Sequence, residues 1–191
     1  MKKVFIIHGW SGSPSEPLHK WLAYELRKKG FAVEVPVMPN PDEPIIEKWV
    51  SKLNKVVGSQ PDEDIILVGH SIGCQAILRY LAGLKTFGFF GGIVFIAPWL
   101  YLSGLENEDK NIAKPWIETQ IDNTKIWKHV PKNKIVAIFS DNDPFVQKDN
   151  WEQFERLFGA KVITELGKGH FTADDGVDNL PSALEAVLGM E

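Results

Sequence analysis

The chain has 191 residues, of which 44% are hydrophobic and 24% charged, and this composition is that of an ordinary globular domain. It excludes collagen, a coiled coil and a disordered chain. Lys and Arg number 21 against 25 Asp and Glu, with no long basic stretch, so we expect no nucleic-acid partner. The first apolar run, residues 4–7, is too short for a secretion signal or a membrane span, and Cys74 is the single cysteine. We therefore expect a cytoplasmic protein without a membrane partner.

Short apolar runs alternate with amphipathic segments along the chain, which is typical of strand-helix units in a mostly parallel sheet. The predicted strands, in chain order, are residues 4–7, 31–37, 65–68, 93–96, 135–139 and 161–164. The predicted helices are about residues 18–26, 43–57, 75–84, 145–158 and 179–188. Residues 98–123 show no strand pattern and are expected to form a short insertion. The pattern predicts one α/β domain over residues 1–191, with about six strands and helices on both faces.

A G-x-S-x-G sequence with Ser71 at its centre directly follows the predicted strand 65–68 and precedes a predicted helix. A nucleophile on such a sharp strand-to-helix turn needs small neighbours two residues away on either side, which Gly69 and Gly73 provide. The bare motif also occurs by chance in a glycine-rich turn. Its strand-turn-helix setting favours Ser71 as a nucleophile.

A nucleophilic serine needs a histidine to take its proton and an acid to orient that histidine, and after such a turn they come in the order acid, then histidine. Asp141 and Asp143 both follow the predicted strand 135–139, and His170 follows the last predicted strand in a glycine-flanked loop. Of the five histidines, His170 fits this order best. We expect His8 and His70 to lie near the site, and His19 and His129 to lie at the surface.

These motifs together resemble the α/β-hydrolase superfamily. More narrowly, the short chain, the His8-Gly9-Trp10 segment, the turn around Ser71 and the Gly169-His170-Phe171 segment resemble the small serine hydrolases related to retinoblastoma-binding protein nine. The resemblance extends over nearly the whole chain. It implies a three-layer α/β-hydrolase fold with a short insertion in place of a large lid.

The resemblance also assigns roles to individual residues. It places the acid at Asp143, because the hydrophobic pair Phe145-Val146 follows at the family's spacing, with Gln147 where the family often has proline. Asp141 then becomes a turn or cap residue. The oxyanion-hole donors are expected to be the backbone N–H groups of Trp10 and Ile72.

We expect four aromatic residues to line a substrate pocket that narrows toward short or medium acyl chains: Trp10, Trp99, Phe145 and Phe171. The predicted activity is hydrolysis of a small-molecule carboxylic ester or related acyl bond. A thioesterase or aminopeptidase would use the same groups. The alternative class is a protein-interaction module on a hydrolase fold, with a protein partner implied only by the family's name.

The sequence predicts neither a cofactor nor a metal. It has no cysteine pair and no glutamate-flanked histidine pair at the spacing of zinc ligands, and the segment around Asp141 lacks the glycine and closing glutamate of a calcium loop. The Gly167-Lys168 pair lacks the earlier glycine of a phosphate-binding loop. We expect Cys74, three residues after Ser71, to be a buried packing residue.

Overall fold

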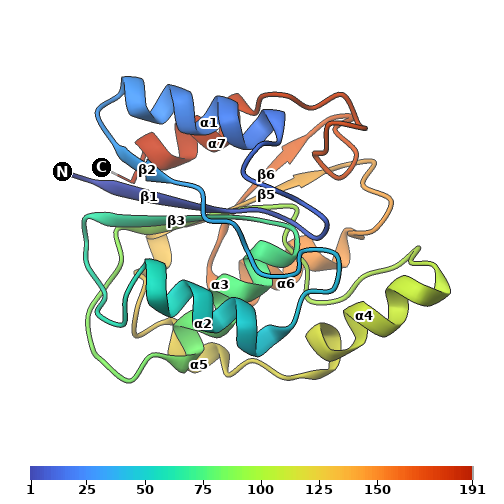
Figure 1. Ribbon diagram of the computed structural model, residues 1–191, viewed down its shortest axis with the longest axis horizontal. Helices are drawn as coiled ribbons and strands as arrows, with labels where there is room; N and C mark the ends of the chain where they lie inside the picture. Colours follow the sequence, from blue (N-terminus) through green and yellow to red (C-terminus); the bar gives the residue numbers. More distant parts are fainter. Residues whose placement is uncertain (191) are drawn as a thin grey trace.

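A computed structural model of the protein describes residues 1–190 and contains a six-stranded, wholly parallel sheet between two layers of helices (Figure 1). The strand order is β2-β1-β3-β4-β5-β6. The strands are β1 (Lys3–Ile7), β2 (Ala32–Glu34), β3 (Ile65–His70), β4 (Gly92–Ile96), β5 (Ile135–Ser140) and β6 (Lys161–Glu165). The predicted α/β-hydrolase architecture is therefore confirmed.

Helices cover both faces of the sheet, with α1 and α7 on one side and α2, α3 and α6 on the other (Figure 1). The helices are α1 (Pro17–Lys28), α2 (Ile46–Val56), α3 (Ile72–Gly83), α4 (Asn107–Glu118), α5 (Asn123–Ile126), α6 (Asp149–Phe158) and α7 (Pro181–Leu188), and a 3-10 turn spans Lys132–Lys134.

The strand side chains alternate between two apolar cores, as the period of a β-strand requires. In β1, Val4 and Ile6 pack with α1 and α7, whereas Phe5 and Ile7 pack with α2 and α3. Each fully buried side chain of this size stabilises the fold by about 1.5–3 kcal/mol. The sheet is thus buried on both faces, and its carboxyl edge is a rigid base for the loops that follow each strand.

Proline explains two differences from the predicted elements near the N-terminus. Strand β2 ends at Glu34, before the expected residue 37, because Pro36 has no N–H to continue the hydrogen-bond ladder. Helix α2 begins at Ile46 because Glu43 precedes Pro44, which disfavours a helical conformation, and the Glu43 N–H instead closes a turn on the carbonyl oxygen of Asn40.

Two helices near the site also begin at other residues than predicted. Helix α3 begins at Ile72 and not at residue 75, since the chain reverses direction at Ser71 itself. Helix α6 begins at Asp149 and not at residue 145, because the N–H groups of Phe145 and Val146 donate to the Asp143 carboxylate in a turn.

The insertion at residues 98–123 contains α4, and a buried arginine ties it to the core. Arg79 in α3 donates to the carbonyl oxygens of Trp116 at 2.6 Å and Thr119 at 2.8 Å, and to the side chain of Gln75. Burial lowers the pKa of Arg79 to about 10, so the guanidinium is still charged at neutral pH. The insertion is therefore anchored to the domain.

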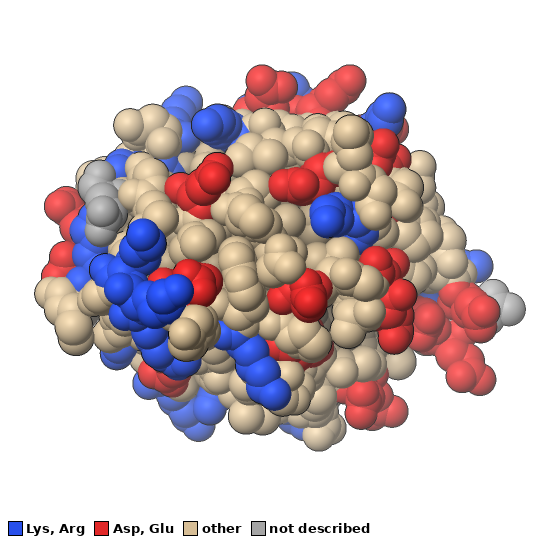
Figure 2. Space-filling model, turned by 90° about the horizontal axis from the view of Figure 1, so that it is seen from above, with Lys and Arg blue, Asp and Glu red and all other residues tan. Residues whose placement is uncertain are grey.

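Acidic and basic side chains are interspersed on the face above α1 and α7, with basic side chains denser at the left of Figure 2. Within residues 1–190, no helix combines the length and the apolarity that crossing a membrane requires.

Candidate active site

Ser71 lies at the carboxyl end of β3 on a strained turn. Its backbone has φ 52° and ψ −120°, a conformation that non-glycine residues rarely adopt. The Ser71 N–H donates to the carbonyl oxygen of Ile96 at 2.9 Å, and the Ser71 carbonyl oxygen accepts from Cys74 at 2.9 Å. These bonds on both sides hold the strained residue in place.

The two glycines of the motif are required by close backbone approach. A Cβ on Gly73 would lie 2.4 Å from the Ile7 carbonyl oxygen and 2.7 Å from that of His8. A Cβ on Gly69 would lie 2.8 Å from the backbone nitrogen of Cys74. The predicted reason for the motif, that strand and helix approach closely at this turn, is what the structure shows.

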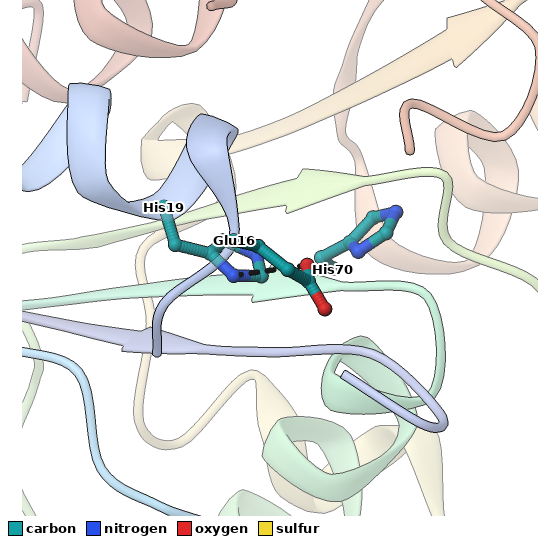
Figure 3. Close-up of side chains that lie close together, drawn as sticks. All are labelled: Glu16, His19 and His70. Carbon is teal, nitrogen blue, oxygen red and sulfur yellow. Dashed lines mark ion pairs between the residues drawn. The ribbon is translucent and has the colours of Figure 1, made fainter. Parts of the chain in front are cut away.

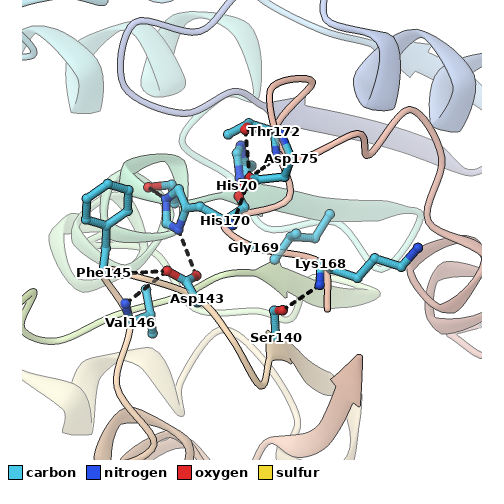
Figure 4. A network of polar contacts seen from close by, with 12 residues as sticks. His70, Ser140, Asp143, Phe145, Val146, Lys168, Gly169, His170, Thr172 and Asp175 are labelled. Atoms are coloured by element: carbon cyan, nitrogen blue, oxygen red, sulfur yellow. Dashed lines mark hydrogen bonds and ion pairs between the residues drawn. The ribbon is translucent and has the colours of Figure 1, made fainter. Parts of the chain in front are cut away.

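The three residues predicted as nucleophile, base and acid form one hydrogen-bonded chain, of which Figure 4 shows the pair of His170 and Asp143. His170 Nε2 lies 2.8 Å from Ser71 Oγ, and His170 Nδ1 lies 2.8 Å from Asp143 Oδ2. The Asp143 side chain is 1% exposed and that of His170 is 14% exposed. A buried carboxylate thus orients a histidine that is open to the cavity on its serine side.

Asp141, the competing acid, has a different position. Its carboxylate is exposed and accepts the N–H of Gly167 at 2.7 Å, so it holds the start of the loop that carries His170. Asn142 accepts the N–H of Gly169 at 2.8 Å. Ser140 accepts the N–H of Lys168 at 3.0 Å (Figure 4). The turn after β5 therefore supports the histidine loop by three successive hydrogen bonds.

Asp175 holds the same loop from the other side, which sequence reasoning missed. Its Oδ2 accepts the N–H groups of His170 at 2.9 Å and Thr172 at 3.0 Å (Figure 4). Gly169 has φ 52°, and a Cβ there would lie 2.1 Å from Asp175 Oδ1, so only glycine fits. An aspartate a few residues after a histidine is too common a pattern to reveal this role.

The two predicted oxyanion donors lie near Ser71, one at the start of α3 and the other in the loop after β1. Ile72 is the first residue of α3, and Trp10 follows Gly9, at which a Cβ would lie 3.5 Å from Ser71 Cβ. Among the described residues, neither the Ile72 nor the Trp10 backbone N–H has a protein acceptor. Both N–H groups are thus available to a ligand.

A cavity of about 420 Å³ opens over Ser71 and His170. Trp10 and Phe145 line it as predicted, and the Phe145 ring meets the His170 ring edge to face at 5.3 Å between centroids. The insertion contributes three further residues, which sequence reasoning did not assign: Leu102, Leu105 and Asp109. The other lining residues include Glu16, His70 and Asp174.

The prediction that Trp99 and Phe171 line the pocket is wrong. Each is 1% exposed and packs in a different core, Trp99 on the α3 side of the sheet and Phe171 on the α1 side. The prediction relied on the positions of Trp99 close to the end of β4 and of Phe171 next to His170. Both side chains instead point into the core where the chain leaves the edge of the sheet.

The surface prediction for two histidines is also wrong, since His19 is 0% and His129 2% exposed. His129 lies beside the buried Phe90, whose N–H donates to the His129 carbonyl oxygen. His19 lies beside His70, with 5.8 Å between ring centroids. Burial lowers the pKa of His19 to about 4 and that of His70 well below its usual value, so both rings are neutral at neutral pH.

Cys74 is fully buried, and its thiol lies 3.4 Å from the carbonyl oxygen of Ile96. Burial raises the pKa of this thiol, which disfavours the reactive thiolate. Cys74 thus lies beside the nucleophile in sequence but packs away from the cavity.

The parallel sheet, with a serine on a strained turn after β3, defines an α/β hydrolase. The chain matches the serine hydrolase family over residues 4–188, and it belongs to this family. The resemblance that the short motifs indicated is therefore confirmed.

Individual relatives agree with this assignment. The chain is 29% identical over 181 residues to YdeN of Bacillus subtilis, covering 94% of this chain and 91% of that protein. It is 26% identical over 170 residues to serine hydrolase RBBP9 of Rattus norvegicus, covering 86% and 78% of the two chains.

Solved structures show the same fold. The crystal structure of the Bacillus subtilis ydeN gene product has a TM-score of 0.88 at 27% identity, covering 100% of this chain and 98% of that one. Est1E from Butyrivibrio proteoclasticus has a TM-score of 0.69 at 16% identity, covering 99% and 88%, and supports the fold alone.

Proposed function

We propose that this serine hydrolase is a carboxylesterase-like enzyme in which Ser71, His170 and Asp143 form the catalytic triad. The observation that carries the proposal is the continuous hydrogen-bonded chain from Ser71 Oγ through the His170 ring to the buried Asp143 carboxylate. Of the two aspartates after β5, only Asp143 contacts this ring.

In the acylation step, Ser71 Oγ attacks the carbonyl carbon of the ester while His170 Nε2 takes the hydroxyl proton. Asp143 keeps the other ring nitrogen protonated and stabilises the imidazolium that forms. The protonated His170 then gives its proton to the leaving alcohol as the bond between carbon and the alcohol oxygen breaks. An acyl group remains on Ser71.

Two backbone donors stabilise the charge that develops on the carbonyl oxygen. The Trp10 and Ile72 N–H groups fit this role because neither has a protein acceptor, and the positive end of the α3 dipole adds to the field at Ile72. One such donor contributes about 10²–10³-fold to the rate. Water then attacks the acyl group with His170 as base, which releases the acid and regenerates Ser71.

The cavity lining supports a neutral or cationic substrate of modest size. Apolar walls come from Leu102, Leu105 and Phe145, whereas three carboxylates contribute negative charge: Glu16, Asp109 and Asp174. Among the described residues, no lysine or arginine lines the cavity. A volume of about 420 Å³ lies near the lower end of ligand pockets, at roughly 300–1,000 Å³. We expect short or medium acyl esters to be preferred over long-chain and anionic ones.

The test of the mechanism is covalent labelling with a fluorophosphonate probe, followed by mass spectrometry. We expect one adduct on the native protein, located at Ser71 and lost in Ser71→Ala. Ser11→Ala is the matched control, since Ser11 lines the same cavity, and it should keep the adduct. An unlabelled native protein, or an adduct that survives Ser71→Ala, would contradict the triad and favour the interaction-module alternative.

A panel of substrates then tests the reaction class. It contains p-nitrophenyl esters of increasing acyl length, a neutral and an anionic ester of equal length, a thioester and an amino-acid anilide. Turnover of short neutral esters above the other members is expected. Higher kcat/KM for the thioester or the anilide would replace the esterase assignment with a thioesterase or aminopeptidase that uses the same triad.

A further inference from the structure

Three side chains outside the proposed triad lie together beside the cavity: Glu16, His19 and His70 (Figure 3). One ligand atom from each lies within 4.8 Å of the ligand atoms of the other two. Glu16 and His70 line the cavity, and His19, wholly buried, lies next to them in α1. Glu16 precedes α1, whereas His70 ends β3, so the fold brings them together.

The hydrogen bonds of the two histidines fix where their lone pairs lie. His70 Nε2 is 2.8 Å from the His170 carbonyl oxygen, which can only accept, so Nε2 carries the hydrogen and Nδ1 the lone pair. His19 Nδ1 is 3.2 Å from both the Ser13 carbonyl oxygen and Glu16 Oε2. His19 Nδ1 therefore carries its hydrogen in the metal-free protein, and an ion beside Glu16 would replace this hydrogen, which then moves to Nε2.

His70 Nδ1, which has the lone pair, is buried and has no hydrogen-bond partner in the part of the chain that the structure describes. Buried polar atoms are normally paired, so this atom needs an explanation. The proposed hydrolysis does not use it. Two neutral imidazoles and a carboxylate are a common donor set of zinc sites with an open position.

We propose that Glu16, His19 and His70 form a binding site for a divalent cation of the zinc class, with a further coordination position open to the cavity. Zinc bonds to nitrogen and oxygen are about 2.0–2.2 Å long, so the three ligand atoms must close to about 3.4 Å from one another. Glu16 can provide this movement, because its side chain is 31% exposed, whereas that of His19 is 1% exposed.

The bound ion would lower the hydrolase rate, a consequence that rests on the proposed function. The His70 and His170 rings are 5.5 Å apart between centroids, and His70 donates to the backbone of His170. A cation on His70 opposes the positive charge that His170 acquires when it takes the Ser71 proton. We expect a rate decrease of roughly tenfold or more at saturation.

The test is calorimetric titration of the metal-free protein with ZnCl₂, together with the visible absorption spectrum of the Co²⁺ form. We expect one ion per chain and the intense bands of low-coordinate Co²⁺. His70→Gln and His19→Gln should abolish binding, and Glu16→Gln should weaken it. Because the buried variants can lose their fold, circular dichroism accompanies each one, and Glu16→Gln, at a partly exposed position, decides the outcome if they do.

Two control variants separate this site from others. His129→Gln changes a buried histidine outside the cluster and should bind Zn²⁺ as the unmodified protein does. Ser71→Ala should also keep binding, which shows that the measurement does not depend on hydrolysis. The proposal is overturned by absent Zn²⁺ binding, by binding that Glu16→Gln leaves unchanged, or by binding that His170→Ala abolishes while His19→Gln keeps it.

The activity arm is read separately. Zn²⁺ should inhibit ester turnover in the unmodified protein and in His129→Gln at the same concentration that saturates the calorimetric site. Binding without inhibition would overturn the predicted effect on His170 but keep the site. If the protein hydrolyses no ester, the proposed function fails, whereas the calorimetric result still decides the metal site.

Discussion

Gly73→Ala tests the claim that close backbone approach, and not helix propensity, sets the residues around Ser71. The substituted Cβ would lie 2.4 Å from the Ile7 carbonyl oxygen, where real Cβ contacts are essentially never below 3.0 Å. The neighbour is the backbone of a central strand and cannot rotate away as a side chain would. Either β1 or the first turn of α3 must therefore shift.

The free energy of unfolding should fall by about 2 kcal/mol. Overpacking of this kind costs about 3 kcal/mol, and replacing a helical glycine with alanine returns about 0.5–1 kcal/mol. In a domain of this size the loss corresponds to a Tm decrease of about 4–8 °C. Gly83→Ala, at the other end of the same helix, meets nothing within 4 Å and should stabilise by about 0.5–1 kcal/mol.

Urea unfolding followed by tryptophan fluorescence measures both variants, and fluorophosphonate labelling reports the site. Gly73→Ala should also label more slowly, because the shift moves the loop that carries the Trp10 N–H. If Gly73→Ala unfolds at the same urea concentration as the unmodified protein, or if Gly83→Ala loses as much stability, the steric argument is refuted.

Three further predictions concern other parts of the molecule. Cys74 should not react with a disulfide reagent in the native protein, since burial raises its pKa, and should react fully in urea; rapid native reaction would contradict its burial. Arg79→Met should lower the free energy of unfolding in urea by about 2–4 kcal/mol, because buried carbonyl oxygens lose their donor. Arg156→Met, at the surface, should leave the free energy of unfolding unchanged. Equal urea midpoints for the two variants would disprove the anchoring of the insertion. Asp143→Asn should slow ester turnover about 10³–10⁴-fold, and Asp141→Asn by less than about tenfold, so the reverse order would reassign the acid.

Local patterns in the sequence were enough for the sheet and for the residues at the ends of its strands. Apolar runs of four or five residues predicted the four central strands, because a strand buried on both faces tolerates little else. The partly exposed edge strands β2 and β6 were predicted from the more polar segments 31–37 and 161–164. The glycine spacing around Ser71 predicted the turn. The two glycines are needed because Gly69 lies against Cys74, a few residues away in the chain, and Gly73 lies against the end of β1. Asp143 and His170 were predicted from the order of acid and histidine after such a turn and from the family resemblance, and both follow parallel strands that end at one edge.

Side-chain direction beyond the strand ends depends on tertiary packing. Trp99 and Phe171 lie in the core and not in the pocket, because the chain turns inward after β4 and after His170. His19 is buried although its helical neighbours are mixed, because α1 packs that face against the sheet beside His70. No periodicity in α1 distinguishes such a histidine from an exposed one.

The sequence by itself thus determined which residues stand at the carboxyl edge, because strand ends are a local property. Only the tertiary structure decided which of them touch. Asp143 and not Asp141 meets His170, since the turn after β5 points one carboxylate inward and the other toward Gly167. Glu16 and His70, far apart along the chain, converge because the first turn of α1 lies beside the end of β3, a contact between elements that residue spacing does not encode.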